Sequence, residues 1–251
     1  MECFYHHKWK KWDEVIESDA SMDDIDTETI DEYIKSAKES GRLTGLQDIT
    51  VTKLLENLRL LENGKLKRGG IVLFGKNPNR FYDNIQVKIS RLGSDYYDFK
   101  FQDILEGNII RLLKEIPKHL NRKFFNKPVD FENFQRIEKG EFPVGAIREM
   151  ILNAIIHRDY MGDPTEIMIY DECFSTLNAG LLPLELTIES LSEQHPSIPR
   201  NPLIADVCFK GGYIDACGGG MQKIINLSKE AGLQNPGIKV QYGEFLVRMC
   251  K

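Results

Sequence analysis

Residues 141–160 (EFPVGAIREMILNAIIHRDY) constrain the fold more than any other part of the sequence. After Pro143, apolar residues recur at three- and four-residue steps, namely Ile147, Ile151, Ala154 and Ile155. This period is typical of a helix with one buried face, so we expect a helix that begins near Val144. A chain with such a helix at its centre needs a sheet or other helices to cover that face.

A second, polar stripe runs along the same predicted helix. Glu149, Asn153 and His157 are four residues apart, so their side chains lie along one line of the surface. Asn is a poor residue for a helix interior, because its amide competes for backbone hydrogen bonds. A carboxylate and an amide one turn apart can hold a hydrated Mg²⁺ and orient a water. The stripe therefore predicts either a solvated polar face or a magnesium and water site.

The composition limits the classes of protein that the chain can belong to. Of 251 residues, 41% are hydrophobic and 28% are charged, which is ordinary for a globular protein. The net charge of −5 gives no general attraction to nucleic acid, so DNA contact needs a local patch or another domain. We expect no membrane contact, because no apolar run approaches the roughly twenty residues of a membrane span. The scattered cysteines predict reduced thiols and a cytoplasmic location: Cys3, Cys173, Cys208, Cys217 and Cys250.

The first part of the chain reads as two segments. Residues 1–26 combine an aromatic and basic start with an acidic end, and we interpret them as the tail of an upstream domain that is absent here. Residues 27–95 predict helices over 27–41 and 50–62, a turn at Asn63-Gly64, and strands over 70–75 and 85–89. This order is also that of a winged helix, in which Lys65, Lys67 and Arg68 could face phosphates, or simply form a solvated turn.

Residues 96–251 predict an α/β unit. Helices are expected over 101–120, 184–192 and 204–209, and strands over 131–137 and 245–249. A hairpin of 166–170 and 174–177 ends in the turn Asn178-Ala179-Gly180. The glycine run 218–220 opens a further helix. Because a helix start without side chains leaves its N–H groups free, this run predicts an anion site or a glycine-rich hinge. Lys76 follows a glycine, but the GxxxxGK[ST] phosphate loop is absent, so the chain holds no P-loop helicase motor.

Three motifs in order resemble a known family: REMILNAIIHRDY, LNAGLLPLELTIESL and HPSIPRNPLIADVCFKGGYIDACGGGMQKI. They are similar to the C-terminal domain of bacterial proteins called RecG-related ATP-dependent helicases or transcriptional regulators, which carry a Schlafen-type AlbA-like domain first. More broadly they resemble the Bergerat nucleotide-binding fold of the gyrase, Hsp90, histidine kinase and MutL (GHKL) superfamily. The resemblance is sharpest over 140–251. It implies an α+β chain, with a helical, winged-helix-like segment followed by a two-layer Bergerat-like sandwich.

The resemblance also implies roles for individual residues. Glu149 stands where the superfamily has its water-activating carboxylate, and Asn153 where it has the Mg²⁺-binding amide. Asn178 stands where an Asp accepts from the adenine amino group, and Gly180 matches the glycine of that turn. Gly218 and Gly220 match the phosphate-loop glycines. The family's own motifs contain four further residues to which the resemblance gives no role: His157, Arg158, Asp159 and Arg200.

One departure from the superfamily pattern concerns the base. An amide at position 178 accepts more weakly than a carboxylate and can present its NH₂ group instead. Three hypotheses follow: an ATP- and Mg²⁺-binding regulatory module that signals to an attached DNA-binding domain, a degenerate scaffold for dimerisation or for partner or DNA binding, and weak ATP hydrolysis with Glu149 as general base. The sequence favours the first and leaves homo-oligomer formation open.

Overall fold

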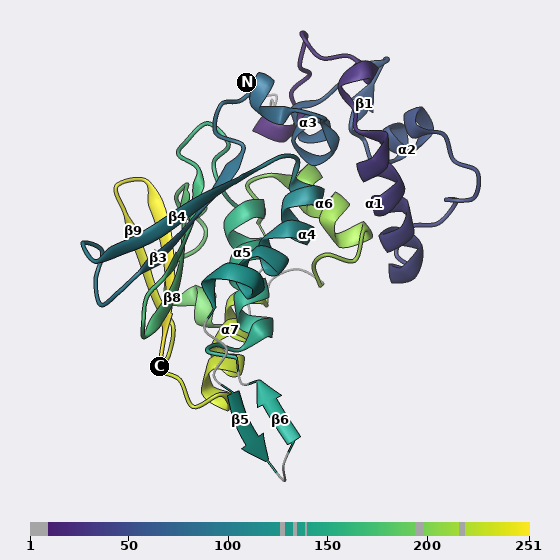
Figure 1. Cartoon of the computed structure of the whole chain (residues 1–251). Helices are drawn as coiled ribbons and strands as arrows, with labels where there is room; N and C mark the ends of the chain where they lie inside the picture. Colours follow the sequence, from purple (N-terminus) through teal and green to yellow (C-terminus); the bar gives the residue numbers. More distant parts are fainter. Residues whose placement is uncertain (1–9, 126–128, 133–134, 139, 194–197, 216–218) are drawn as a thin grey trace, which may run out of the picture.

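The computed structural model describes residues 10–125, 129–132, 135–138, 140–193, 198–215 and 219–251. Figure 1 shows a mixed sheet with helices gathered on one side of it, and a smaller helical region formed by the first part of the chain. The α+β class predicted from the sequence is confirmed. Within the described residues, no helix is long and apolar enough to cross a membrane.

The helices form where the sequence supplies caps or apolar periodicity. They are α1 (Thr27–Ser40), α2 (Val51–Asn57), α3 (Arg68–Phe74), α4 (Ile109–His119), α5 (Val144–Ile156), α6 (Pro202–Lys210) and α7 (Gly220–Glu230). Short 3₁₀ turns are η1 (Trp12–Glu14), η2 (Met22–Asp24), η3 (Pro78–Arg80) and η5 (Ser190–Ser192), and η4 (Leu120–Phe124) is a π-helical turn. For α1 both predicted ends are confirmed, since Asp26 accepts from the backbone N–H groups of Glu28 and Thr29 and Gly41 ends the helix with φ +66°.

Six strands make the main sheet in the order β4-β3-β7-β8-β10-β9. They are β3 (Gln86–Leu92), β4 (Phe99–Glu106), β7 (Thr165–Ile169), β8 (Cys173–Ala179), β9 (Gly237–Gln241) and β10 (Glu244–Cys250). Only the β3–β7 pair is parallel. Two small hairpins stand apart from this sheet: β1 (Leu61–Glu62) with β2 (Lys65–Leu66), and β5 (Val129–Glu132) with β6 (Gln135–Glu138).

Helices α4 and α5 pack against the sheet, and α7 packs against α5. The buried apolar side chains of the helical first part and of the sheet region belong to one continuous core. The boundary expected at residue 95 separates β3 from β4, which are paired neighbours in the sheet. The division into domains stays a prediction, and the core that positions the centre of the chain draws on both sides of that boundary.

Several predicted elements are wrong. The helix expected over 184–192 contains only the short turn η5, and the single strand expected over 131–137 is the hairpin of β5 and β6. The apolar run at 70–75 is not a strand but lies in helix α3, whose residues from Gly69 to Phe74 are all buried. A continuous apolar run fits a fully buried helix as well as a buried strand, so periodicity could not decide. The predicted winged-helix order loses its first strand for the same reason. The expected helix 101–120 splits into β4 and α4, because Gly107 has φ +133° and the Asn108 side chain caps α4 by accepting from the Arg111 N–H.

The cysteine prediction is wrong for one pair. Cys173 and Cys250 face each other across β8 and β10 and form a disulfide, with their Cα atoms 4.1 Å apart. They are 77 residues apart in the sequence, so only the strand pairing brings them together. Cys208 is a buried free thiol, as expected. Cys3 and Cys217 lie outside the described residues.

The segment before α1 packs across the helical part of the chain. Trp12 stacks on Tyr160 with ring centroids 5.1 Å apart, and bridges join Ile16 to Lys67 and Ile25 to Gly75. The fully buried Asp13 accepts hydrogen bonds from the backbone N–H groups of Leu203 (2.8 Å) and Ile204 (3.1 Å). These are orphan donors in the first turn of α6, so Asp13 caps α6 from 190 residues away.

Two substitutions of Asp13 distinguish its role as a helix cap from the effect of its buried charge. Burial raises the pKa of the Asp13 carboxyl from 3.8 to about 6, although its two backbone hydrogen bonds act in the opposite direction. We expect Asp13→Ala to lower the free energy of unfolding by about 1–2 kcal/mol, the usual cost of a lost N-cap. Asp13→Asn keeps an acceptor and buries no charge, so it should lose much less. Urea unfolding of both variants and the unchanged protein at pH 7 measures this.

The raised pKa of the Asp13 carboxyl also predicts that the free energy of unfolding depends on pH. An acid whose pKa is raised by folding binds its proton more tightly in the folded state, so stability falls as pH rises between the unfolded and folded pKa values. Relative to Asp13→Asn, the unchanged protein should lose stability between about pH 4 and pH 6 and then level off. A constant difference between the two proteins across this range would contradict the burial argument.

Candidate functional site

A cavity of about 410 Å³ opens between α5, β8, β10 and the N-terminus of α7. Its wall is largely apolar, with Met150, Ala154, Leu186 and Val247 among the lining residues. Ligand sites in proteins are commonly concave, mostly apolar and of this size, with a few polar groups that orient the ligand. The polar groups of this cavity come from four segments that are far apart in the sequence.

Helix α5 supplies the polar stripe seen in the sequence. Asn153 and His157 line the cavity, and Glu149 lies one turn before Asn153 beside the start of α7. The opposite side of α5 is buried against the sheet and α4. Because apolar residues claim that side of the helix, the stripe is left facing the space between α5, β8 and α7.

Strand β8 supplies the second polar group. Thr176 and Asn178 alternate onto the side of the sheet that faces the helices, and both line the cavity while being nearly completely buried. The Asn178 Nδ2 group donates to the Ala179 carbonyl at 3.1 Å. No described residue donates to the Asn178 Oδ1 atom. The amide is therefore oriented so that its oxygen is the atom left to accept from a ligand.

The turn after β8 needs a glycine. Gly180 has φ +125°, and a Cβ there would lie 3.2 Å from the Arg200 Nε atom. The Arg200 guanidinium donates to the Leu181 carbonyl at 2.9 Å and lies 3.5 Å from an oxygen of Asp159. Gly180 thus lets Arg200, from the loop before α6, close over the turn and line the cavity.

The remaining residues of the HRDY motif have structural roles. The buried Arg158 donates to the carbonyls of Asn84 (3.1 Å) and Asp163 (2.9 Å), which ties the chain after α5 to the chain before β3. The Tyr160 hydroxyl donates to the Ile155 carbonyl, and the Tyr160 ring stacks on Trp12. Neither residue lines the cavity. Arg158 and Tyr160 therefore support the site without lining it. Asp159 does not line the cavity either, and it lies 3.5 Å from Arg200.

The start of α7 comes within contact distance of the α5 stripe. A Cβ at Gly220 would lie 2.6 Å from Glu149 Oε1 and 2.9 Å from Asn153 Nδ2, so only glycine fits there without a shift. At Gly219 a Cβ would meet nothing within 4 Å. Gly218, the other predicted phosphate-loop glycine, lies outside the described residues.

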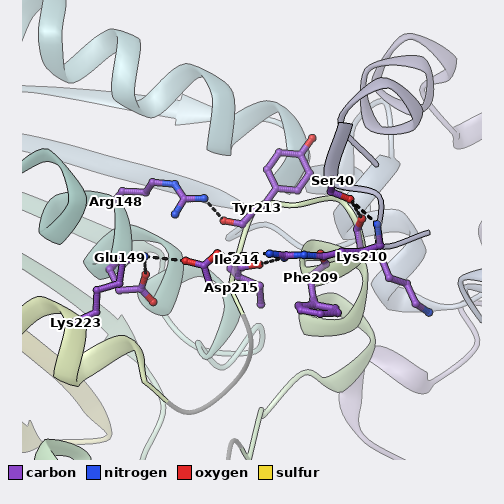
Figure 2. A network of polar contacts seen from close by, with 10 residues as sticks. Ser40, Arg148, Glu149, Phe209, Lys210, Tyr213, Ile214, Asp215 and Lys223 are labelled. Atoms are coloured by element: carbon purple, nitrogen blue, oxygen red, sulfur yellow. Dashed lines mark hydrogen bonds and ion pairs between the residues drawn. The ribbon is translucent and has the colours of Figure 1, made fainter. Parts of the chain in front are cut away.

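Glu149 lies in a network of charged side chains (Figure 2). The Lys223 ammonium lies 3.7 Å from Glu149 and 2.8 Å from Asp215, and Arg42 lies 3.5 Å from Asp215. Burial raises the pKa of the Glu149 carboxyl, and Lys223 partly offsets this rise. The hydrogen bond from Lys223 lowers the pKa of Asp215. The carboxylate expected to activate water is thus held in an ion pair.

Sequence reasoning missed three residues of this region. Lys11, from the segment before α1, lines the cavity, and so does Thr176. Lys223 follows the glycine run by one helical turn, and its partners could not be read from the sequence because Glu149 and Asp215 reach it only in the folded chain. For Thr176 a signal existed, since it precedes Asn178 by two residues on a strand and so shares its face.

Two family models match parts of the chain. Residues 162–249 match the model described as "Putative ATP-dependent DNA helicase recG C-terminal". Residues 4–88 match a domain of unknown function, DUF8451. The first match runs from β7 into β10 with α6 and α7 between them, and so includes Asn178, Gly180, Arg200 and Gly220. It supports a RecG-related, ATPase-like domain in this part of the chain.

A search of solved structures finds the crystal structure of the DIP2311 protein from Corynebacterium diphtheriae. The superposition has a TM-score of 0.74 at 21% sequence identity and covers 95% of this chain and 47% of that one. The two proteins therefore share a fold, and this chain spans about half the length of the protein it matches. No curated protein matches.

Asn201 beside the cavity allows a test of the supporting structure. Its buried side-chain amide donates to the carbonyls of Ile156 (2.8 Å) and Arg158 (2.9 Å) and so joins the end of α5 to the start of α6. Asn201→Ala leaves both carbonyls without a donor, and we expect a loss of about 2 kcal/mol or more in the free energy of unfolding. Gln222→Ala, which removes an exposed amide, should change it by less than about 0.5 kcal/mol. Equal stability of the two variants in urea would contradict this role.

Proposed function

We propose that the chain carries a Bergerat-type nucleotide-binding module of a DNA-associated, RecG-related transcriptional regulator, and that ATP occupies the cavity between α5, β8 and α7. One observation carries the proposal. Asn153, Asn178, Gly180 and Gly220 come from three separate motifs, and all four line this cavity. The match of residues 162–249 to the RecG C-terminal model supports the ATP-binding part of the proposal.

The base would lie against β8 and β10. Thr176, Asn178 and Val247 line the cavity from the sheet and include two polar groups, and Met150 and Ala154 line it from α5. The free Oδ1 acceptor of Asn178 suits the exocyclic amino group of adenine. Guanine has a carbonyl oxygen at that position, which would meet the acceptor with another acceptor. The orientation of the amide thus compensates for the missing carboxylate.

The phosphates would lie toward the start of α7. Helix N-termini attract anions through free N–H groups and the helix dipole, and Gly220 leaves this end without a side chain. Asn153 lies beside Gly220 and can donate to a phosphate oxygen through its amide.

The resemblance implies Mg²⁺ on Asn153, but the donor set beside this amide does not fit a resident metal. Glu149 is already paired with Lys223. In the part of the chain that the structure describes, no group of three or more His, Cys, Asp or Glu side chains could hold a metal ion. Hydrolysis with Glu149 as general base would also require its release from Lys223. The proposal is therefore nucleotide binding, with no step through a metal.

The second candidate function is a scaffold for dimerisation or partner binding. It is favoured by the exposed apolar side chains on and beside the edge strand β4, among them Tyr97, Phe99 and Ile104. Under either function, DNA contact would come through an upstream domain. The two functions differ in whether the cavity needs a ligand.

Titration calorimetry with ATP and GTP tests the proposed ligand. We expect ATP to release or absorb measurable heat and to bind about tenfold more tightly than GTP, since one hydrogen bond in a buried site is worth about 1.4 kcal/mol. Asn178→Ala should weaken ATP and remove the preference. Absence of heat and of a thermal shift with both nucleotides would leave the scaffold as the function.

The two adjacent glycines provide a matched pair for the phosphate end. Gly220→Ala places a methyl group 2.6 Å from Glu149 Oε1 and 2.9 Å from Asn153 Nδ2, so it should move the ends of these two side chains and weaken the binding of ATP at least about fivefold. Gly219→Ala meets nothing within 4 Å and has a negative φ, so it should bind ATP as the unchanged protein does. Calorimetry of both variants decides the matter, and equal affinities would place the phosphates elsewhere.

A further inference from the structure

Lys223 lies beside the proposed site, and the family resemblance gives this residue no role. It lies in the first full turn of α7, and its ammonium is within 3.7 Å of Glu149 and 2.8 Å of Asp215. Figure 2 shows the three side chains converging from α5, α7 and the connection between α6 and α7. A single ammonium therefore serves two carboxylates next to the proposed phosphate position.

The carboxylates beside Lys223 are already paired with this lysine, which disfavours a divalent ion at the same place. Mg²⁺ prefers an octahedron of oxygen atoms with one or two carboxylates among them. Here both nearby carboxylates are paired with Lys223, Asp215 at 2.8 Å and the only slightly exposed Glu149 at 3.7 Å. The charge that a metal would bring is already supplied by the chain.

We propose that Lys223 is a built-in counter-cation for the phosphates, so that the module binds its nucleotide without a divalent ion. This inference rests on the proposed function. When phosphate approaches the start of α7, the Lys223 ammonium turns from the carboxylates to the phosphate oxygens. Its side chain is 40% exposed, so it has the freedom to turn. The free N–H groups of the α7 start add to the same attraction.

The other charged residues of the network keep the free-energy cost of this exchange small. Asp215 keeps a second cation, because Arg42 lies 3.5 Å away and is itself fixed by bonds to the carbonyls of Phe209 and Ile214. Asp215 therefore stays paired when Lys223 leaves. Without Lys223, Glu149 would face the phosphates as an unpaired negative charge, which would oppose binding.

The test is calorimetry of the full chain with ATP, first with Mg²⁺ and then with EDTA. We expect affinities that agree within about twofold. Lys223→Met should weaken ATP about tenfold in both buffers, the usual effect of losing a hydrogen bond to a charged group. Lys223→Arg keeps the charge and should stay within about threefold of the unchanged protein. Lys229→Met, near the end of the same helix, is the matched control and should change nothing.

The outcomes separate this inference from the function on which it rests. If EDTA weakens ATP tenfold or more, or if Lys223→Met binds like Lys229→Met, Lys223 is not the counter-cation, while nucleotide binding itself stands. If the unchanged protein binds no ATP in either buffer, the proposed function fails and the inference fails with it. Melting curves of the variants show that each is folded, and Lys223→Arg provides the comparison if Lys223→Met is not.

Discussion

The burial of α5 is the constraint on which the rest of the structure depends. This helix packs against β7 and β8 on one side and against α4 and α7 on others, so apolar residues claim most of its circumference. A residue such as Asn153 cannot join those contacts without an unpaired amide. Asn153 and His157 are therefore directed into a gap that the neighbouring elements leave, and that gap is the cavity. A polar face and a cavity here have the same cause.

The cavity also needs its far wall to stay in place, and buried polar side chains do this. Asp13 caps α6, Arg158 donates to carbonyls just before β3 and just before β7, and Asn201 joins α5 to α6. Each serves backbone groups that would otherwise be buried without partners. A buried polar group of this kind fixes one arrangement, because any shift leaves several groups unsatisfied. Motif residues that face away from the cavity are thus explained by the backbone that they hold.

Local signals decided which parts of this fold could be predicted. The ends of α1 and the start of α5 follow from caps and apolar periodicity, and the structure has them as expected. Helix α3 could not be distinguished from a strand because it is buried all round, and the Gly107 break before α4 was present in the sequence but outweighed by the apolar pattern. The Cys173 disulfide and the Lys223 ion pairs depend on residues that meet only after folding, so no local pattern carried them.

The charges around the cavity fit one another. Under the proposed function, the base end of the cavity has the neutral Asn178, and Lys223 supplies a cation beside the phosphate end. Both residues keep the site from being strongly negative. The carboxylates of Glu149, Asp159 and Asp215 each have a cation within 4.0 Å. Among the described residues, the cavity lining itself holds one carboxylate, Glu185, and two cations, Lys11 and Arg200. A polyanion entering there can therefore be attracted by these cations, by Lys223 and by the helix end. A site that relies on a metal needs the opposite arrangement, with carboxylates left open to bind it.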